Sequence, residues 1–204
     1  QQEGKSQVFF MKDIHSHGLM SIYAKLGRTL PGKVAVKLHS GEPGGHHFLA
    51  PDLIKDLVQS VNGTIVECNT AYPGKRFTTA DHKQALAAHG FTAIASVDVM
   101  DEEGSISLPF PNGKNIKEDF VGSHFANYDS CLVLSHFKGH QMGGFGGALK
   151  NISIGIASGE GKMWIHTAGG TRNLSDFGAA FKTPQDLFLE SMAEAAGAVM
   201  NKLG

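Results

Sequence analysis

Short apolar runs alternate along this chain with longer segments in which apolar residues recur at helical spacing. The short runs are β-branched or alternate with polar residues, which is typical of strands, and we expect strands at 6–12, 33–39, 64–68, 91–99 and 131–134. Helices are expected after Asp13, at 51–61 and 79–90, from about Gly147 and from Thr183. Residues 105–120 interrupt this order and predict a short hairpin or excursion.

The alternation of strands and helices predicts an α/β fold with a mostly parallel sheet and helices on both faces. This is the Rossmann-like, three-layer sandwich. No internal repeat, linker or low-complexity segment divides the 204 residues. We therefore expect residues 1–204 to form a single α/β domain.

Polar, glycine-bearing loops follow three of the expected strands: HSGEPGG, NTAYPGKR and SHFKGHQMGGFGG. Parallel strands place their carboxyl ends on one edge of the sheet, where ligands of open α/β folds bind. Side chains far apart in sequence are thus expected to converge there: His39, Glu42, Asn69, Tyr72, Arg76, His136, His140 and Lys150.

Composition narrows the classes of partner. The net charge is −1 and basic residues are scattered, so no nucleic-acid surface is expected, and no apolar run is long enough to cross a membrane. Cys68 and Cys131, the only two cysteines, lie in apolar runs and read as buried thiols. They cannot build an iron–sulfur cluster within this chain.

Because the first residue is Gln1 rather than Met, two locations for a soluble protein stay open: periplasmic after cleavage of a signal peptide, otherwise cytoplasmic.

The segment 131–151 organises the candidate site, because an apolar run there leads into a glycine cluster and then a helix. The glycines Gly143, Gly144, Gly146 and Gly147 allow backbone N–H groups to approach an anion closely. Lys150 is expected in the first helical turn, where the helix dipole disfavours a cation. That placement indicates a phosphate, a carboxylate or a covalent attachment as its partner, the alternative being an amine in solvent. Arg76 is either a bidentate clamp for the same anion or a surface loop charge.

Eleven histidines are many for this length. Imidazole is both a ligand for borderline metals and the usual acid or base near neutral pH. We expect His140, Lys150 and His136 to be catalytic, the four glycines with Lys150 and Arg76 to bind a cofactor, and His166, His39 and Glu42 to bind metal. For each histidine the alternative is a hydrogen-bonded or solvated side chain, and for Glu42 a base or a plain loop carboxylate.

Several segments together resemble the family named domain of unknown function 362. They are KVAVKLHSGEPGG, TIVECNTAYPGKR with TADHKQALAAHGF, and SHFKGHQMGGFGGALKN with SIGIASGEGKMWIHTAGG, which cover nearly the whole chain. Relatives often carry a ferredoxin-like module, so the resemblance implies an iron–sulfur redox partner. They also continue past the last helix, which implies a C-terminal continuation beyond Gly204.

A more distant resemblance is to the N-terminal domain of lactate racemase-type enzymes. His140, the turn GFGGALK and His166 match the order His, glycine-rich turn, Lys, His of those enzymes. Gly146 stands where they have Ser, and their early D-x-T-R element is not evident. The resemblance implies that His140 is an acid/base residue, that Lys150 attaches a nickel-pincer nucleotide, and that His166 is a metal ligand.

Two functions follow as hypotheses. The first is an enzyme, a metal- or cofactor-dependent isomerase or oxidoreductase, that acts on a small anionic substrate by histidine acid/base chemistry. A divalent metal (Ni, Zn or Fe) and a nucleotide-like cofactor are its candidate ligands. The second is a metal, redox or ligand-binding module without turnover. The sequence leaves the substrate and the oligomeric state open.

Overall fold

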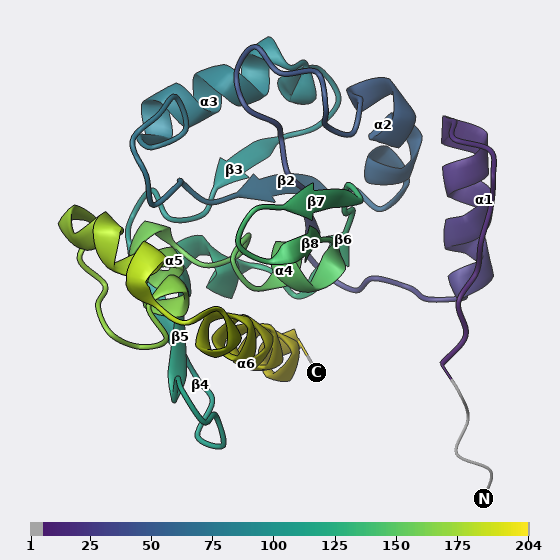
Figure 1. The fold of residues 1–204 in the computed structure, drawn as a ribbon. Coiled ribbons are helices and arrows are strands. Elements are labelled where there is room, and N and C mark those ends of the chain that lie inside the picture. The colour runs from purple at the N-terminus through teal and green to yellow at the C-terminus, as the bar shows by residue number, and fades with distance from the viewer. Residues whose placement is uncertain (1–5, 204) are drawn as a thin grey trace, which may run out of the picture.

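The computed structural model describes residues 6–203, and its centre is a four-stranded parallel sheet (Figure 1). The strands run in the order β3 (Val97–Val99), β2 (Thr64–Glu67), β1 (Val34–Lys37) and β6 (Ser130–Val133). Val36 of β1 pairs with Ile65 on one side and with Leu132 on the other, in parallel register. All four β1 residues are buried, as expected for a strand in the middle of a covered sheet.

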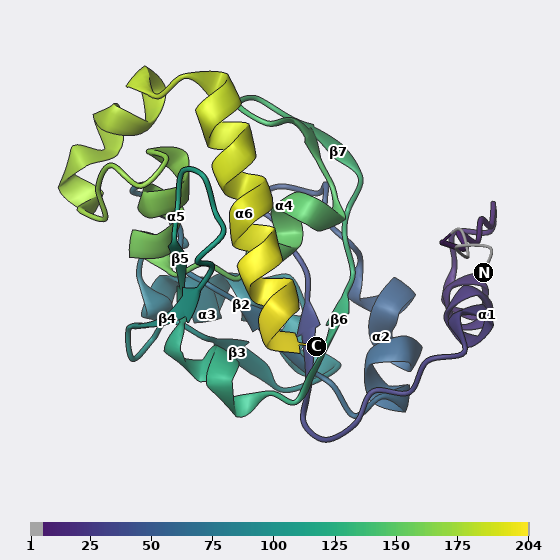
Figure 2. The ribbon, with the colours of Figure 1, turned by 90° about the horizontal axis from the view of Figure 1, so that it is seen from below.

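Helices cover both faces of this sheet, which confirms the predicted α/β sandwich. On one face lie α2 (Pro51–Ser60) and α3 (Thr79–Ala88), and on the other lie α4 (Ala148–Ile152), α5 (Gly159–His166) and α6 (Gln185–Leu203) (Figure 1). Figure 2 shows α6 running the length of the second face. Side chains that alternate along β1 feed the two cores: Val34 and Val36 pack with Leu57 of α2, whereas Ala35 packs with Val199 of α6.

Smaller elements extend this frame. The hairpin of β4 (Ser105–Pro109) and β5 (Glu118–Gly122) is antiparallel, as the interruption at 105–120 predicted, and it projects beside α6 (Figure 1). Helix α1 (Ser16–Leu26) packs on the outer side of α2. The short 3₁₀ segments are η1 (Phe91–Ala93), η2 (Ser123–Asn127) and η3 (Leu174–Lys182).

The order of the strands creates a switch point between β1 and β6. From β1 the chain passes through α2 to β2 and through α3 to β3, moving steadily toward one edge. It then returns to place β6 on the opposite side of β1. Connections thus leave β1 and β6 toward opposite faces, which opens a crevice at their carboxyl ends.

Four local predictions need correction. Residues 6–12 form no strand, because they leave the body of the protein and Val8 and Phe10 are exposed. Of the strand expected at 91–99, only β3 forms; its first residues form η1 with buried Phe91 after the left-handed Gly90. Propensity alone could not separate these outcomes, since both runs are apolar.

The other two corrections concern the glycine-rich stretch and the segment after it. The expected turn is a two-stranded antiparallel ribbon of β7 (Lys138–His140) and β8 (Gly144–Gly146). The helix from Gly147 ends after one turn, and α5 was not predicted. Glycine allows the tight reversal, with Gly144 at φ +66°, while the ladder stabilises strands that have little propensity of their own.

Candidate functional site

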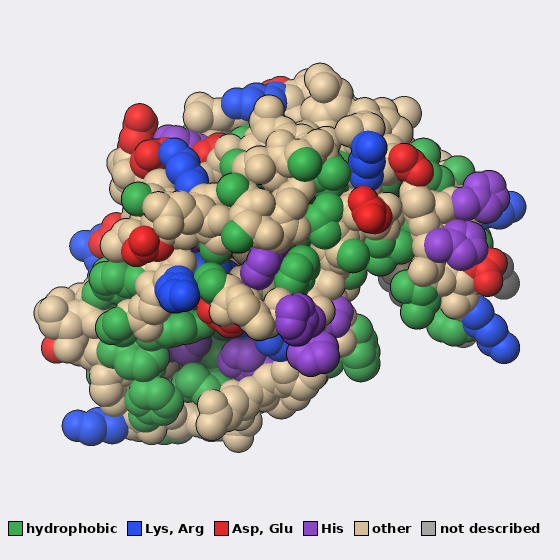
Figure 3. Space-filling view, turned by 90° about the horizontal axis from the view of Figure 1, so that it is seen from above, with side chains coloured by type: hydrophobic (Ala, Val, Ile, Leu, Met, Phe, Trp, Pro, Cys, Tyr) green, Lys and Arg blue, Asp and Glu red, His purple; other side chains and the backbone are tan. Residues whose placement is uncertain are grey.

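A cleft of about 520 Å³ opens at the switch point. It is bordered by residues at or just beyond the carboxyl ends of β1, β2 and β6, by the β7–β8 ribbon, and by α4, α5 and η3. Histidine side chains gather near the middle of the face in Figure 3, with apolar side chains beside them. The volume suits a small molecule.

The floor of the cleft is a set of buried charges that satisfy one another around Glu67. Lys37 Nζ lies 2.6 Å from Glu67 Oε2, and both side chains are almost fully buried. Ser40 donates to Oε1 of the same carboxylate through its backbone N–H (2.8 Å) and its hydroxyl (2.9 Å). Burial by itself would raise the pKa of Glu67, but Lys37 and the neighbouring His82 and Arg76 hold that pKa well below its usual value.

Arg76 extends this set of charges toward the surface. Its Nη1 lies 3.7 Å from Glu67 Oε1, and its Nε donates to Glu42 Oε2 at 3.3 Å. Glu42 is half exposed and also accepts a hydrogen bond from the Tyr72 hydroxyl at 3.2 Å. Every charge in the floor therefore has a partner of opposite sign.

A second part of the cleft is cationic, and the carboxylates that act on Lys162, those of Asp101 and Glu67, lie beyond ion-pair distance. Lys150 and Lys162 line it, and no carboxylate within residues 6–203 lies at ion-pair distance from either amine. Lys162 donates to the Ala157 carbonyl, whereas the Lys150 amine makes no hydrogen bond to a described residue. Burial, reinforced by the charges of Lys138 and Lys162, lowers the pKa of Lys150 to about 8. We call Lys138, Lys150 and Lys162 the lysine end of the cleft.

Histidines His140 and His166 border the lysine end and differ in their hydrogen bonds. The N–H of Gly143 donates to His140 Nδ1 at 3.0 Å, so neutral His140 carries its proton on Nε2. His166 Nδ1 lies 2.6 Å from the Lys162 carbonyl, which can only accept, so neutral His166 carries its proton on Nδ1 and leaves Nε2 as an acceptor. Burial and then the Lys150 charge lower the pKa of His140 to about 4. Burial also dominates for His166, whose pKa falls to about 4 despite its bond to Lys162.

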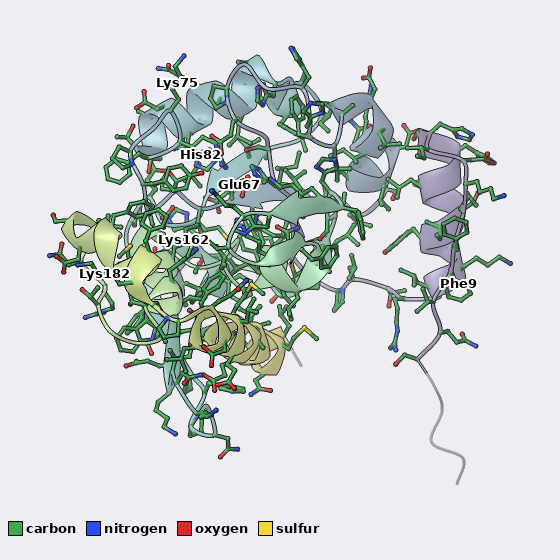
Figure 4. All side chains as sticks on the ribbon, viewed as in Figure 1. Phe9, Glu67, Lys75, His82, Lys162 and Lys182 are labelled. Atoms are coloured by element: carbon green, nitrogen blue, oxygen red, sulfur yellow. The ribbon has the colours of Figure 1, made fainter. Side chains whose placement is uncertain are left out.

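His82, beneath the floor, is fully buried. Its Nδ1 lies 3.2 Å from Asn69 Oδ1, while Asn69 donates to Thr79, so the Nδ1 of His82 is the donor. Its Nε2 has no partner among the described residues. Burial lowers its pKa to about 4. In Figure 4 His82, Glu67 and Lys162 lie inside the protein, whereas Lys75 and Lys182 point away from it.

The structure brings most of the sequence-predicted site residues together. Those that line the cleft are His39, Glu42, Tyr72, Arg76, His136, His140, Gly146, Gly147, Lys150 and His166. Gly143 and Gly144 lie at the turn of the ribbon and do not line it. Asn69 does not line the cleft either, and its Oδ1 accepts a hydrogen bond from His82 Nδ1.

The metal role predicted for His166, His39 and Glu42 stays a prediction. Within residues 6–203, no group of three His, Cys, Asp or Glu side chains is arranged to hold a metal ion. The helix-dipole argument for Lys150 needs correction, because α4 has five residues and Lys150 belongs to its last turn as much as its first. The unusual feature of Lys150 is its partial burial beside other cations.

Three buried charged residues of the cleft were missed from the sequence: Lys37, Glu67 and Lys162. A signal existed for two of them, because a lysine in KVAVKLH and a glutamate in TIVEC are charges within buried strands, and such charges are normally paired. Lys162 had no such signal, because α5 itself was not predicted.

Together, the fold and the cleft define an α/β protein with a ligand-sized, cation-lined crevice at the switch point of a parallel sheet. The chain belongs to the family described as domain of unknown function (DUF362), whose model matches residues 34–203. No curated protein and no solved structure matches the chain. The likeness to lactate racemase-type enzymes therefore stays a prediction.

No helix in the stretch 6–203 combines the length and the apolar character that crossing a bilayer requires.

Proposed function

We propose that this protein binds a small anionic substrate in the cleft and transfers protons to and from it with histidine side chains. The observation that carries the proposal is the Lys150 side chain, which is partly buried beside other cations without a carboxylate at ion-pair distance. An unpaired charge that has lost part of its hydration is costly, so its retention favours an anion supplied from outside. A carboxylate or a phosphate has the matching charge.

The charge balance of the cleft supports the same ligand class. Five cationic side chains and two carboxylates line the cleft, which leaves a surplus of three positive charges when the histidines are neutral. The cations are Lys37, Arg76, Lys138, Lys150 and Lys162, and the carboxylates are Glu42 and Glu67. Since the floor is internally paired, the surplus resides at the lysine end. An anion bound there replaces missing counter-charge and does not compete with an existing ion pair.

The two histidines support proton transfer because their hydrogen bonds give them opposite roles. His166 has an unprotonated Nε2 that can accept a proton and return it, and neutral His140 has an Nε2–H that can donate a hydrogen bond to negative charge developing on the substrate. The Lys150 amine, with a pKa lowered to about 8, neutralises the substrate anion and stabilises negative charge that develops next to it. Bound negative charge also raises the pKa of both imidazoles, so His166 is a stronger base when the cleft is filled.

The binding step is tested by titration calorimetry with inorganic phosphate and with acetate at pH 7. We expect binding by the wild-type protein, at least tenfold weaker binding by Lys150→Met, and unchanged binding by Lys182→Met, a matched control whose lysine is exposed outside the cleft. Equal affinities for all three proteins, or no binding by the wild type, would refute the proposal.

The chemical step is tested by NMR in D₂O with a panel of small 2-oxo and 2-hydroxy carboxylates. Wild-type protein should catalyse exchange of a carbon-bound proton for deuterium. His166→Gln and His140→Gln should bind the same carboxylates but exchange at least a hundredfold more slowly. Binding without exchange across the panel would favour the second hypothesis, a binding module without turnover.

A further inference from the structure

One side of the cleft mouth is formed by three aromatic side chains that come from two separate segments. Tyr72 follows β2, and Phe177 and Phe181 belong to η3. The ring centroids of Tyr72 and Phe177 are 6.0 Å apart, and those of Phe177 and Phe181 are 5.3 Å apart in an edge-to-face arrangement. These three residues, all of which line the cleft, are called the aromatic lip.

The aromatic lip is not simply part of the core. Tyr72 is 41% exposed and Phe181 is 67% exposed. The neighbouring Ala180 of η3 is buried, so η3 is attached to the protein while the ring of Phe181 stays in contact with water. Clustered aromatic rings that stay in contact with water keep apolar surface available, and such patches typically mark binding sites. Their place at the rim of a ligand-sized cleft identifies a small molecule, rather than another protein, as the occupant.

Tyr72 connects this apolar surface to the charged floor. Its hydroxyl donates to Glu42, which is itself paired with Arg76, while its ring contacts Phe177. The hydroxyl and the ring of Tyr72 therefore each have a partner within the protein before any ligand binds. A pre-ordered ring of this kind loses little conformational entropy on binding.

From these contacts we infer that the ligand is an anion attached to a flat aromatic or heteroaromatic ring. The anionic group lies at the lysine end and the ring lies against the aromatic lip. The inference rests on the proposed function, because it adds a second recognition element to an anionic ligand. Both nucleotides and aromatic acids have this chemistry, and the ligands in the test below separate them.

A second aromatic pair provides a control within the same molecule. Phe137 and Phe145 have ring centroids 4.9 Å apart, and Phe137 is 80% exposed, but neither residue lines the cleft. Replacing Phe137 removes a comparable exposed ring without touching the proposed site.

The experiment compares ligands of matched charge by titration calorimetry: phenyl phosphate with methyl phosphate, and adenosine 5′-monophosphate with ribose 5-phosphate. We expect the wild type to bind at least one ring-bearing member about tenfold more tightly than its partner. The double variant Phe177→Leu/Phe181→Leu should lose this preference while binding methyl phosphate as before. Phe137→Leu should keep the preference.

The outcomes distinguish this inference from the function on which it rests. Binding of all four ligands without preference for a ring, or a preference that survives in the double variant, overturns the inference and leaves the anion site intact. If no ligand binds the wild type, the proposed function fails and this inference fails with it. A preference only for the adenosine ligand identifies a nucleotide, and one only for phenyl phosphate identifies an aromatic acid.

Discussion

The floor and the lysine end of the cleft contain the same kinds of side chain in opposite electrostatic states. In the floor, Lys37 and Arg76 are paired with Glu67 and Glu42 within hydrogen-bond or ion-pair distance. At the lysine end, Lys150 and Lys162 have no carboxylate of residues 6–203 at ion-pair distance. A compensated buried cluster holds the fold, whereas an uncompensated one is a cost that a ligand can remove. Opposite responses to mutation should therefore distinguish the two regions.

The largest effect is expected from breaking the floor. Glu67→Gln keeps the shape of the side chain but leaves Lys37 buried without its counter-charge, which should lower the free energy of unfolding by about 3 to 5 kcal/mol. Urea denaturation measures this change. The double variant Lys37→Met/Glu67→Gln should recover most of the loss, since no unpaired lysine then remains. A loss under 1 kcal/mol in the single variant would show that the floor does not depend on its ion pair.

The next largest effect is expected from acid, which should lower the free energy of unfolding by protonating the buried histidines near the floor and the lysine end. Burial lowers the pKa of His82 and of His166 to about 4, below the 6.5 of an unfolded histidine. Between pH 6.5 and 4 the unfolded chain thus binds more protons than the folded protein, so stability falls as the pH falls through this window. We expect a loss of about 1 to 2 kcal/mol per histidine between pH 7 and pH 5.

Urea denaturation at the two pH values, repeated with His166→Gln, measures this dependence. The variant should show a smaller difference between pH 7 and pH 5 than the wild type. His47→Gln, which changes an exposed histidine, should leave the difference unchanged. Equal pH dependence in His166→Gln and the wild type would contradict the assignment of neutral, buried His166. Glu67 does not contribute to the change in stability between pH 7 and pH 5, because the stability due to its lowered pKa is lost only below about pH 4.5.

The lysine end should respond to mutation with the opposite sign from the floor. Burial lowers the pKa of Lys150 from 10.5 to about 8, so its charged form destabilises the fold below pH 8, and this cost disappears as the pH rises from 8 to 10.5. Lys150→Met should therefore raise the free energy of unfolding at pH 7 by about 1 to 3 kcal/mol while weakening anion binding. Denaturation at pH 7 and pH 10 tests both parts, because the gain should shrink at the higher pH. Destabilisation at pH 7 would mean that Lys150 has a structural partner.

The sequence predicted the sheet and the location of the site better than it predicted which charged side chains are paired. β1 and β2 were predicted correctly because each begins as a short, β-branched run and is followed by a polar, glycine-bearing loop. The β7–β8 ribbon could not be read, since its glycines favour no local structure and its ladder depends on tertiary contacts. Whether a lysine is paired, as Lys37 is, or unpaired, as Lys150 is, depends on residues far away in the sequence. Spacing along the chain therefore located the cleft but did not separate its two ends.

The smallest effect tests whether burial, rather than distance, makes the floor important. Lys83 and Glu102 also lie 2.6 Å apart, but their side chains are 44% and 42% exposed. Water screens such a pair and already solvates both partners, so Glu102→Gln should change the free energy of unfolding by less than about 1 kcal/mol. The value from urea denaturation should fall further at high salt. A loss as large as that of Glu67→Gln would show that the N–O distance governs both pairs, and the contrast between a compensated floor and an uncompensated lysine end would lose its physical basis.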